Sequence, residues 1–243
     1  MVTRTGLPRR GQFKDLTFKK INIYIYKMDE LMNLAIDDGN LEKMKQLRED
    51  GYLFSVFTFS HASYNGNLEN MKWLKTNGCK FDDFTFDGAA QNGSKDNMIW
   101  LKDNGCPFGY HTFSHAFKNG SKDNMNWLLD NGCPFTKQTF GQAAHHGNLD
   151  TMKWLKDNGC PFDKSTFVYA VKNGSIENMK WLHKNGCPFS EYTFSDAAEK
   201  GLLDNMKWLK EVGCDFDPLT LSSAAIYGSK ENIQWLLDNG CPK

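Results

Sequence analysis

The stretch CPFDKSTFVYAVKNGSIENMKWLHKNG (residues 160–186) decides the fold of this protein, because the chain repeats it in tandem. Its cysteine and its tryptophan both recur at a constant step of 27 residues. The cysteines are Cys79, Cys106, Cys133, Cys160, Cys187, Cys214 and Cys241, and the tryptophans are Trp73, Trp100, Trp127, Trp154, Trp181, Trp208 and Trp235. The chain has no other cysteine or tryptophan, so each must be read as a repeat position before it is considered as a functional residue.

The first half of the stretch predicts a short helix. We expect Thr166 to be its N-cap, because the hydroxyl can accept an N–H of the first turn. Phe167, Ala170 and Val171 follow at i, i+3 and i+4, which places them on one apolar face. Gly174 then ends the helix, because glycine adopts the left-handed cap conformation at little cost.

The second half predicts another helix, with Ser175 as its N-cap. Equivalent residues in the other units are also Ser or Asn, apart from Leu202. Met179, Trp181 and Leu182 are expected in the core, and Asn-Gly at 185–186 ends the helix. The following Cys-Pro-Phe turns the chain back toward the next unit.

These units predict an all-α solenoid of stacked helix–turn–helix repeats. Residues 52–243 hold seven full units and a stub, residues 25–51 form a partial capping unit, and residues 1–24 are a basic N-terminal arm. One unit is too small to bury its own apolar face, so stacked neighbours must form a continuous core. The alanine that recurs in every unit, Ala170 in the quoted stretch, lets neighbouring helices approach closely, while Trp and Phe side chains fill the wider gaps between them. The run INIYIYK (21–27) forms a short strand or leads into the first helix.

An asparagine precedes the core methionine position in most units, at 70, 97, 124, 178, 205 and 232. A half-buried amide needs hydrogen-bond partners. We therefore expect a ladder of side-chain to backbone bonds between units.

No constellation of residues predicts catalysis, a cofactor or a metal. Each unit contributes one cysteine with no second ligand beside it, whereas zinc sites use ligands close in sequence. Packed helices lie about 8–10 Å apart, too far for disulfides between neighbouring cysteines. The six histidines form no triad, and the recurrent Gly-Ser is a capping device rather than a phosphate loop. We therefore expect the cysteines to be small buried thiols, and the protein not to be an enzyme.

The array resembles the ankyrin repeat family. In FTFDGAAQNGSKDNMIWLKDNGC (84–106), Phe86, Ala89, Ala90 and Gly93 overlay the family's Leu, Ala-Ala and first Gly, and the second helix follows in register. Thr85 stands at the family's Pro, and the capping His is replaced by Asp87. The unit is shorter than an ankyrin repeat in the segment that forms the projecting β-hairpin, so the resemblance implies shortened hairpin loops. It covers about residues 28–241, and the N-G-C-P-F variant looks like arrays in giant DNA viruses of amoebae and algae.

The resemblance also implies where a partner would bind. Differences between units gather in the loop after Pro-Phe and after the alanine pair of the first helix, places that line the partner-binding face of ankyrin domains. The candidate partner-binding residues are Tyr64, Gln91, Tyr110, His111, Lys118, Lys137, His145, Lys164, Lys172, Glu191, Tyr192 and Glu199. The alternative interpretation is that these are tolerant solvent positions.

The sequence thus favours a non-enzymatic scaffold that binds a protein, with a host-cell protein as the expected partner. The alternative is a nucleic-acid-associated helical-repeat protein, which the net charge of zero does not favour. The chain has no apolar run long enough to span a membrane and no secretory signal, and its many cysteines suit a reducing compartment. We therefore expect an intracellular protein, in the host cytoplasm, with no small-molecule ligand; the sequence leaves the oligomeric state open.

Overall fold

The computed structural model describes residues 30–119, 121–136, 138–146 and 149–242, and every regular element in these ranges is a helix. The prediction of an all-α repeat solenoid is confirmed. The basic arm and the 21–27 run lie outside the described residues.

The described residues divide into two compact units at Pro134 and Phe135. In the first unit, residues 30–37 are helical and are followed by α2 (Leu41–Glu49), α3 (Thr58–Asn65), α4 (Leu68–Thr76), α5 (Thr85–Asn92), α6 (Lys95–Asp103), α7 (Thr112–Asn119) and α8 (Lys122–Asp130). The second contains α9 (Thr139–His145), α10 (Leu149–Asp157), α11 (Lys164–Asn173), α12 (Ile176–Lys184), α13 (Thr193–Lys200), α14 (Leu203–Glu211), α15 (Thr220–Tyr227) and α16 (Lys230–Asp238).

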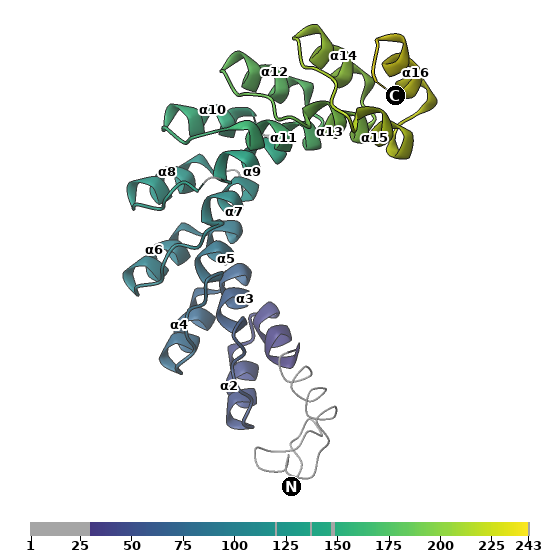
Figure 1. The fold of residues 1–243 in the computed structure, drawn as a ribbon. Coiled ribbons are helices and arrows are strands. Elements are labelled where there is room, and N and C mark those ends of the chain that lie inside the picture. The colour runs from purple at the N-terminus through teal and green to yellow at the C-terminus, as the bar shows by residue number, and fades with distance from the viewer. Residues whose placement is uncertain (1–29, 120, 137, 147–148, 243) are drawn as a thin grey trace, which may run out of the picture. The chain divides into compact units, whose positions relative to one another are not determined.

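Within each compact unit the helices form two rows (Figure 1). The first helices of successive repeats pack directly on one another, α3 on α5 and α5 on α7, and likewise from α9 through α15. Buried alanines such as Ala89 and Ala90 allow this close approach, as the sequence predicted. Each first helix also packs on its own second helix.

The caps of the first helices differ from the prediction, because the threonine that recurs in every full repeat is not the N-cap. Its hydroxyl instead accepts from the backbone N–H three residues earlier, at 2.8–3.3 Å in every full repeat. Among the described residues, the side chain at that earlier position accepts the N–H two residues later in five of the seven full repeats, as Asp82 does from Phe84 at 2.8 Å. The threonine therefore has the role of the third residue of a capping box, reaching back to the cap. Asp163 and Thr166 form both halves of that box.

The caps of the second helices agree with the prediction. Side chains at this position accept a backbone N–H of the first turn in α2, α4, α6, α8, α12 and α16. Leu202, at the start of α14, makes no such bond. The helices α3, α5, α11 and α13 end at left-handed glycines such as Gly174 (φ 83°), whereas Gly228 after α15 has extended backbone.

The aromatic residues join neighbouring repeats, and the tryptophans are less buried than predicted. Phe167 of α11 is fully buried, meets the return-turn Phe189 edge-on at 4.9 Å, and stacks on Trp208 of α14 at 6.4 Å. The same stacking joins Phe59 to Trp100, and Phe86 to Trp127. Trp208 is the one buried tryptophan, at 8% exposure, and the other six are half-buried.

The asparagine ladder between repeats is confirmed at four of the six predicted positions, whereas the Nδ2 atoms of Asn70 and Asn178 make no hydrogen bond. The Nδ2 of Asn97 donates to the carbonyl of Gly66 at 2.7 Å, and Asn124, Asn205 and Asn232 repeat this bond to the glycine 31 residues earlier. This bond satisfies both a buried amide and the carbonyl at a helix end. The amide of Asn70, which is buried too, makes no hydrogen bond.

Candidate functional site

The predicted partner-binding residues lie on the first-helix side of the repeats and in the loops before it. Of those that the structure describes, all but the half-buried Gln91 are exposed. Lys137 lies outside the described residues. The repeat positions that pack one repeat on the next are buried, whereas these variable positions face solvent. This exposure is expected both of a recognition surface and of solvent positions that tolerate substitution.

The structure brings five of these residues together in one groove of the second compact unit. The groove has a volume of about 420 Å³ and runs along α11, α13 and the start of α15. The predicted residues that line it are Lys164, Lys172, Glu191, Tyr192 and Glu199. Three successive repeats contribute to the groove, so residues that are about 27 and 54 positions apart in the sequence line it together.

Charges of both signs line this groove. Lys164 Nζ lies 3.7 Å from Glu191 Oε2 across neighbouring repeats, and both side chains remain largely exposed. Burial raises the pKa of Asp196 above its ordinary value, and the carboxylates of Glu199 and Asp217 act in the same direction, while Lys172 opposes them. The groove can therefore pair with cationic and anionic groups of a ligand at separate points.

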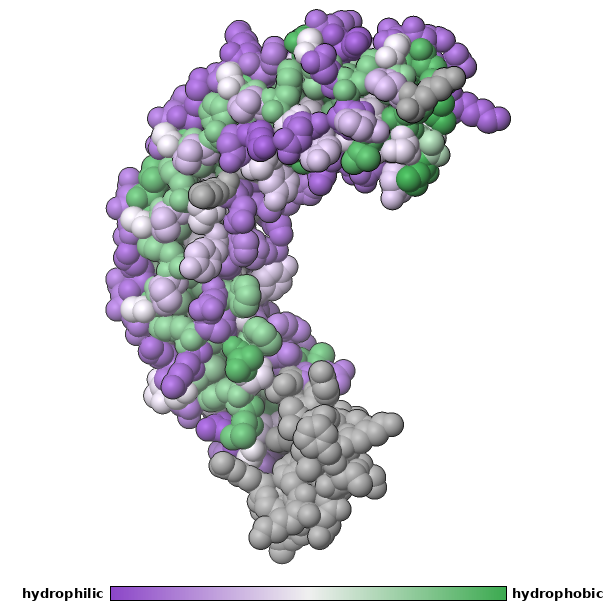
Figure 2. Space-filling view, in the orientation of Figure 1, coloured by the Kyte–Doolittle hydropathy of each residue, from purple (hydrophilic) through white to green (hydrophobic). Residues whose placement is uncertain are grey.

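The comparison of repeats within the sequence did not identify the apolar residues of this groove. Val168 lines the groove, and Leu219, which is 51% exposed, lines both it and an adjoining hollow of about 440 Å³ with Tyr192 and Pro218. Figure 2 shows hydrophobic atoms over α15. The available signal was Leu219 itself, since it occupies the same repeat position as Tyr192.

A smaller groove of about 240 Å³ lies on α3 and α5 of the first compact unit. It contains the predicted Tyr64 and Gln91, whose Oη and Nε2 lie 3.5 Å apart. Two exposed rings that the prediction missed, Phe57 and Phe84, also line it, and Figure 2 shows hydrophobic atoms over α3. These two phenylalanines stand one residue before the threonine, which is the repeat position of the predicted His111 and Tyr192, so the sequence carried a signal for them.

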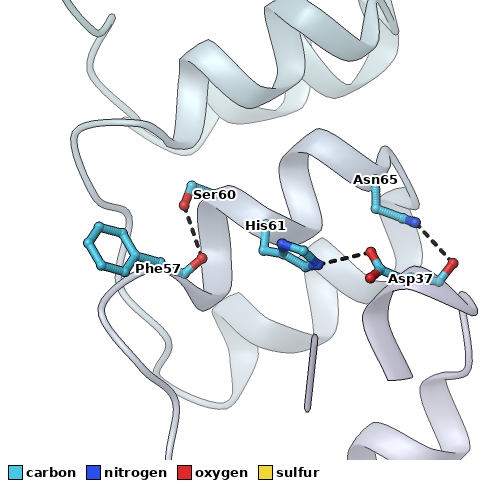
Figure 3. Close-up of polar contacts among 5 residues, drawn as sticks. All are labelled: Asp37, Phe57, Ser60, His61 and Asn65. Carbon is cyan, nitrogen blue, oxygen red and sulfur yellow. Dashed lines mark hydrogen bonds and ion pairs between the residues drawn. The ribbon is translucent and has the colours of Figure 1, made fainter. Parts of the chain in front are cut away.

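Hydrogen bonds tie α3 to Asp37, at the end of the 30–37 helix, beside this groove. His61 Nε2 lies 2.9 Å from a carboxylate oxygen of Asp37, and Asn65 Nδ2 donates to the Asp37 carbonyl at 3.1 Å (Figure 3). The hydroxyl of Ser60 donates to the Phe57 carbonyl at 2.9 Å. The wall of the groove that α3 forms is therefore fixed by hydrogen bonds of Ser60, His61 and Asn65.

His115 of α7 also lines the groove, and its ring stacks on the predicted His111 with centroids 6.4 Å apart. His115 Nδ1 lies 3.2 Å from the carbonyl of Asp87, and burial lowers the pKa of this histidine. Asp87 is 1% exposed and accepts from Thr112 at 2.6 Å, and burial raises the pKa of its carboxyl group. Among the described residues, no three His, Cys, Asp or Glu side chains are grouped to hold a metal ion.

The remaining predicted residues stand apart from both grooves. Tyr110 is 81% exposed before α7, and Lys118 is exposed on that helix. The ring of His145, at the end of α9, lies 5.7 Å from His146 and 6.1 Å from Tyr169. The structure therefore gathers about half of the predicted set into grooves.

The seven cysteines are free and buried, as predicted. Burial raises the pKa of six of them to about 12, from Cys79 through Cys214, and also raises that of Cys241. A thiol that stays protonated is a poor nucleophile and a poor metal ligand. Their regular spacing therefore reflects packing.

No family model and no curated protein matches the chain. Within the described residues, none of the helices combines the length and apolarity needed to cross a lipid bilayer.

Proposed function

We propose that this protein is a non-enzymatic scaffold of the ankyrin type that binds another protein through the groove on α11, α13 and α15. The observation that carries the proposal is the gathering of Lys164, Lys172, Glu191, Tyr192 and Glu199 in that groove. The repeat does not dictate these residues, whereas the residues it does dictate are mostly buried. An exposed tyrosine among charges of both signs is the composition of a protein recognition surface.

The resemblance to viral repeat arrays extends this proposal to the origin of the partner and the compartment in which it is met. The partner would then be a host-cell protein, met in the cytoplasm of an infected amoeba or alga. Mixed charge in the groove supports a protein partner more than a nucleic acid, because a phosphate backbone would meet Glu191 and Glu199 as well as the lysines.

The proposal is tested by capturing partners from amoebal and algal lysates on the full-length chain, before and after nuclease treatment. We expect bound proteins to survive nuclease and to fall several-fold with Lys172→Glu combined with Tyr192→Ala. The matched control is Lys180→Glu on α12, an exposed lysine of the second helix row, which should leave capture unchanged. Capture that disappears with nuclease would contradict the proposal and support the nucleic-acid alternative.

A further inference from the structure

The groove on α3 and α5 presents two aromatic rings to solvent at one end. Phe57 is 59% exposed and Phe84 is 49% exposed, and their ring centroids lie 6.3 Å apart at 47° to each other. Figure 3 shows the Phe57 ring standing away from the start of α3. Elsewhere in this unit the chain places cations over phenylalanine rings, as with Lys75 Nζ 3.9 Å from the centroid of Phe81. In the part of the chain that the structure describes, no lysine or arginine lies over Phe57 or Phe84.

Carboxylates hydrogen-bond directly to residues that line this groove. One oxygen of Asp82 accepts from the N–H of Phe84 at 2.8 Å, and the other accepts from the N–H of Ser60 at 3.2 Å. Asp37 bonds to His61 at 2.9 Å. The groove lining contains no lysine or arginine. With these two carboxylates bonded to its lining and no lysine or arginine in it, this groove favours a cationic ligand, whereas two lysines and three carboxylates line the groove of the second compact unit.

The groove is pre-formed, because its floor and walls are fixed by packing. A Cβ added to Gly88 would lie 2.8 Å from the carbonyl oxygen of Ser60 and 2.9 Å from the backbone nitrogen of Tyr64, so at Gly88 the backbones of α5 and α3 are in direct contact. Asp82 holds the starts of both helices through its two bonds. Binding of a ligand would therefore order few protein groups and lose little conformational entropy in the protein.

We propose that this groove binds an arginine-bearing segment of a partner protein, with the guanidinium against Phe57 and Phe84 beside the Asp82 carboxylate. Arginine fits better than lysine, because its planar cation stacks on aromatic rings and donates to a carboxylate in a fixed fork. Asp82 is half-buried, and a carboxylate has about four acceptor sites, of which two are filled. Apolar atoms of the same segment would lie toward Tyr64. The inference rests on the proposed function as a protein-binding scaffold and assigns it a second, chemically distinct contact.

The test measures binding of fluorescently labelled short peptides to the full-length chain at neutral pH. The peptides share randomised flanks and differ in a fixed central residue, which is arginine, lysine, glutamate or the neutral isostere citrulline. We expect the arginine peptides to bind roughly 2- to 5-fold more tightly than the citrulline peptides, the range of an exposed cation–π contact. Lysine should be intermediate and glutamate weakest.

The double variant Phe57→Leu, Phe84→Leu should remove the preference for arginine over citrulline, because it keeps apolar bulk and deletes the rings. The matched control is Tyr192→Leu, which alters the same repeat position in the other groove and should leave the preference intact. Equal binding of arginine and citrulline peptides, or a preference that survives the double variant, would overturn the inference. Self-association or oligonucleotide binding that the double variant abolishes would overturn it too, by identifying another occupant. None of these outcomes affects the lysate test of Lys172 and Tyr192, so the two proposals fail separately.

Discussion

At the scale of the residue, the asparagine before the core methionine position does more than fill space. Asn97 donates to Gly66, the residue that caps the end of α3, and so couples two repeats through one buried bond. Asn70 occupies the same repeat position and is equally buried, yet its amide makes no hydrogen bond. The protein therefore contains its own comparison between a bonded and an unbonded amide.

We predict that Asn97→Leu lowers the free energy of unfolding by about 1–3 kcal/mol, because it leaves the Gly66 carbonyl without this buried donor. Asn70→Leu should cost less or increase stability, since it removes amide atoms that already lack partners. Urea unfolding followed by tryptophan fluorescence measures both variants. Equal losses in the two would show that the inter-repeat bond contributes nothing.

The arrangement of Asp87 and Gly109 is a second residue-scale feature. Position 109 is the cap position of the first helix, where the other full repeats have Ser, Thr or Asp. A Cβ there would collide with the carboxylate of Asp87, which accepts from Thr112 at 2.6 Å. The carboxylate beside this cap therefore comes from the preceding repeat, and glycine makes room for it.

At the scale of the element, each helix depends on its cap, because a short helix leaves several N–H groups without partners inside it. The cap of one first helix can also serve its neighbour. Asp217 caps the start of α15 and accepts from the N–H of Ser195 in α13 at 2.8 Å. The helix starts of adjacent repeats are thus fixed to one another by single side chains.

The second helix α14 lacks its side-chain cap, because Leu202 stands at the cap position with 43% of its surface exposed. We predict that Leu202→Ser raises the free energy of unfolding by roughly 0.5–1 kcal/mol, since the hydroxyl can accept from the first turn. The converse variant Ser175→Ala at the start of α12 should lose about 1 kcal/mol. Thermal unfolding of both variants checks the pair, and a destabilised Leu202→Ser would show that the leucine's packing on Gly174 matters more.

At the scale of the whole molecule, a repeat array adds many small equal contributions, because each repeat contacts its neighbours in the same way. The thiols illustrate this. Burial raises the pKa of six thiols from the ordinary value of 9.0 to about 12, and raises that of Cys241 as well. A raised pKa in the folded state stabilises the fold below the unfolded pKa, and this stability is lost as pH rises toward the folded value.

We therefore predict that the chain loses stability as the pH rises from 9 toward 12, by roughly 1 kcal/mol per buried thiol at pH 10. A variant with alanine at all seven cysteine positions should show a shallower decline. Urea midpoints at neutral and alkaline pH measure the difference, and comparison with the variant subtracts the titration of lysine and tyrosine. Parallel declines in the two proteins would contradict the prediction.

The repeat period, the helix pairs, the second-helix caps and the buried thiols follow from the sequence alone. Each depends on spacing within one repeat or on hydrogen bonds across three or four residues, so local chemistry is enough. The inter-repeat asparagine ladder could also be anticipated, because a regular polar residue in a core stripe needs a partner.

Packing between repeats settles the rest. Thr166 looked like a cap, but the residue three positions earlier is the cap, because the chain enters the helix through a turn that the threonine closes. The tryptophans looked like core residues, yet most are half-buried, since their exposure depends on rings in the preceding repeat. The two grooves arise where residues one or more repeat steps apart meet, so the solvent exposure and charge surroundings of Phe57 and Phe84 are properties of the stack rather than of any single repeat.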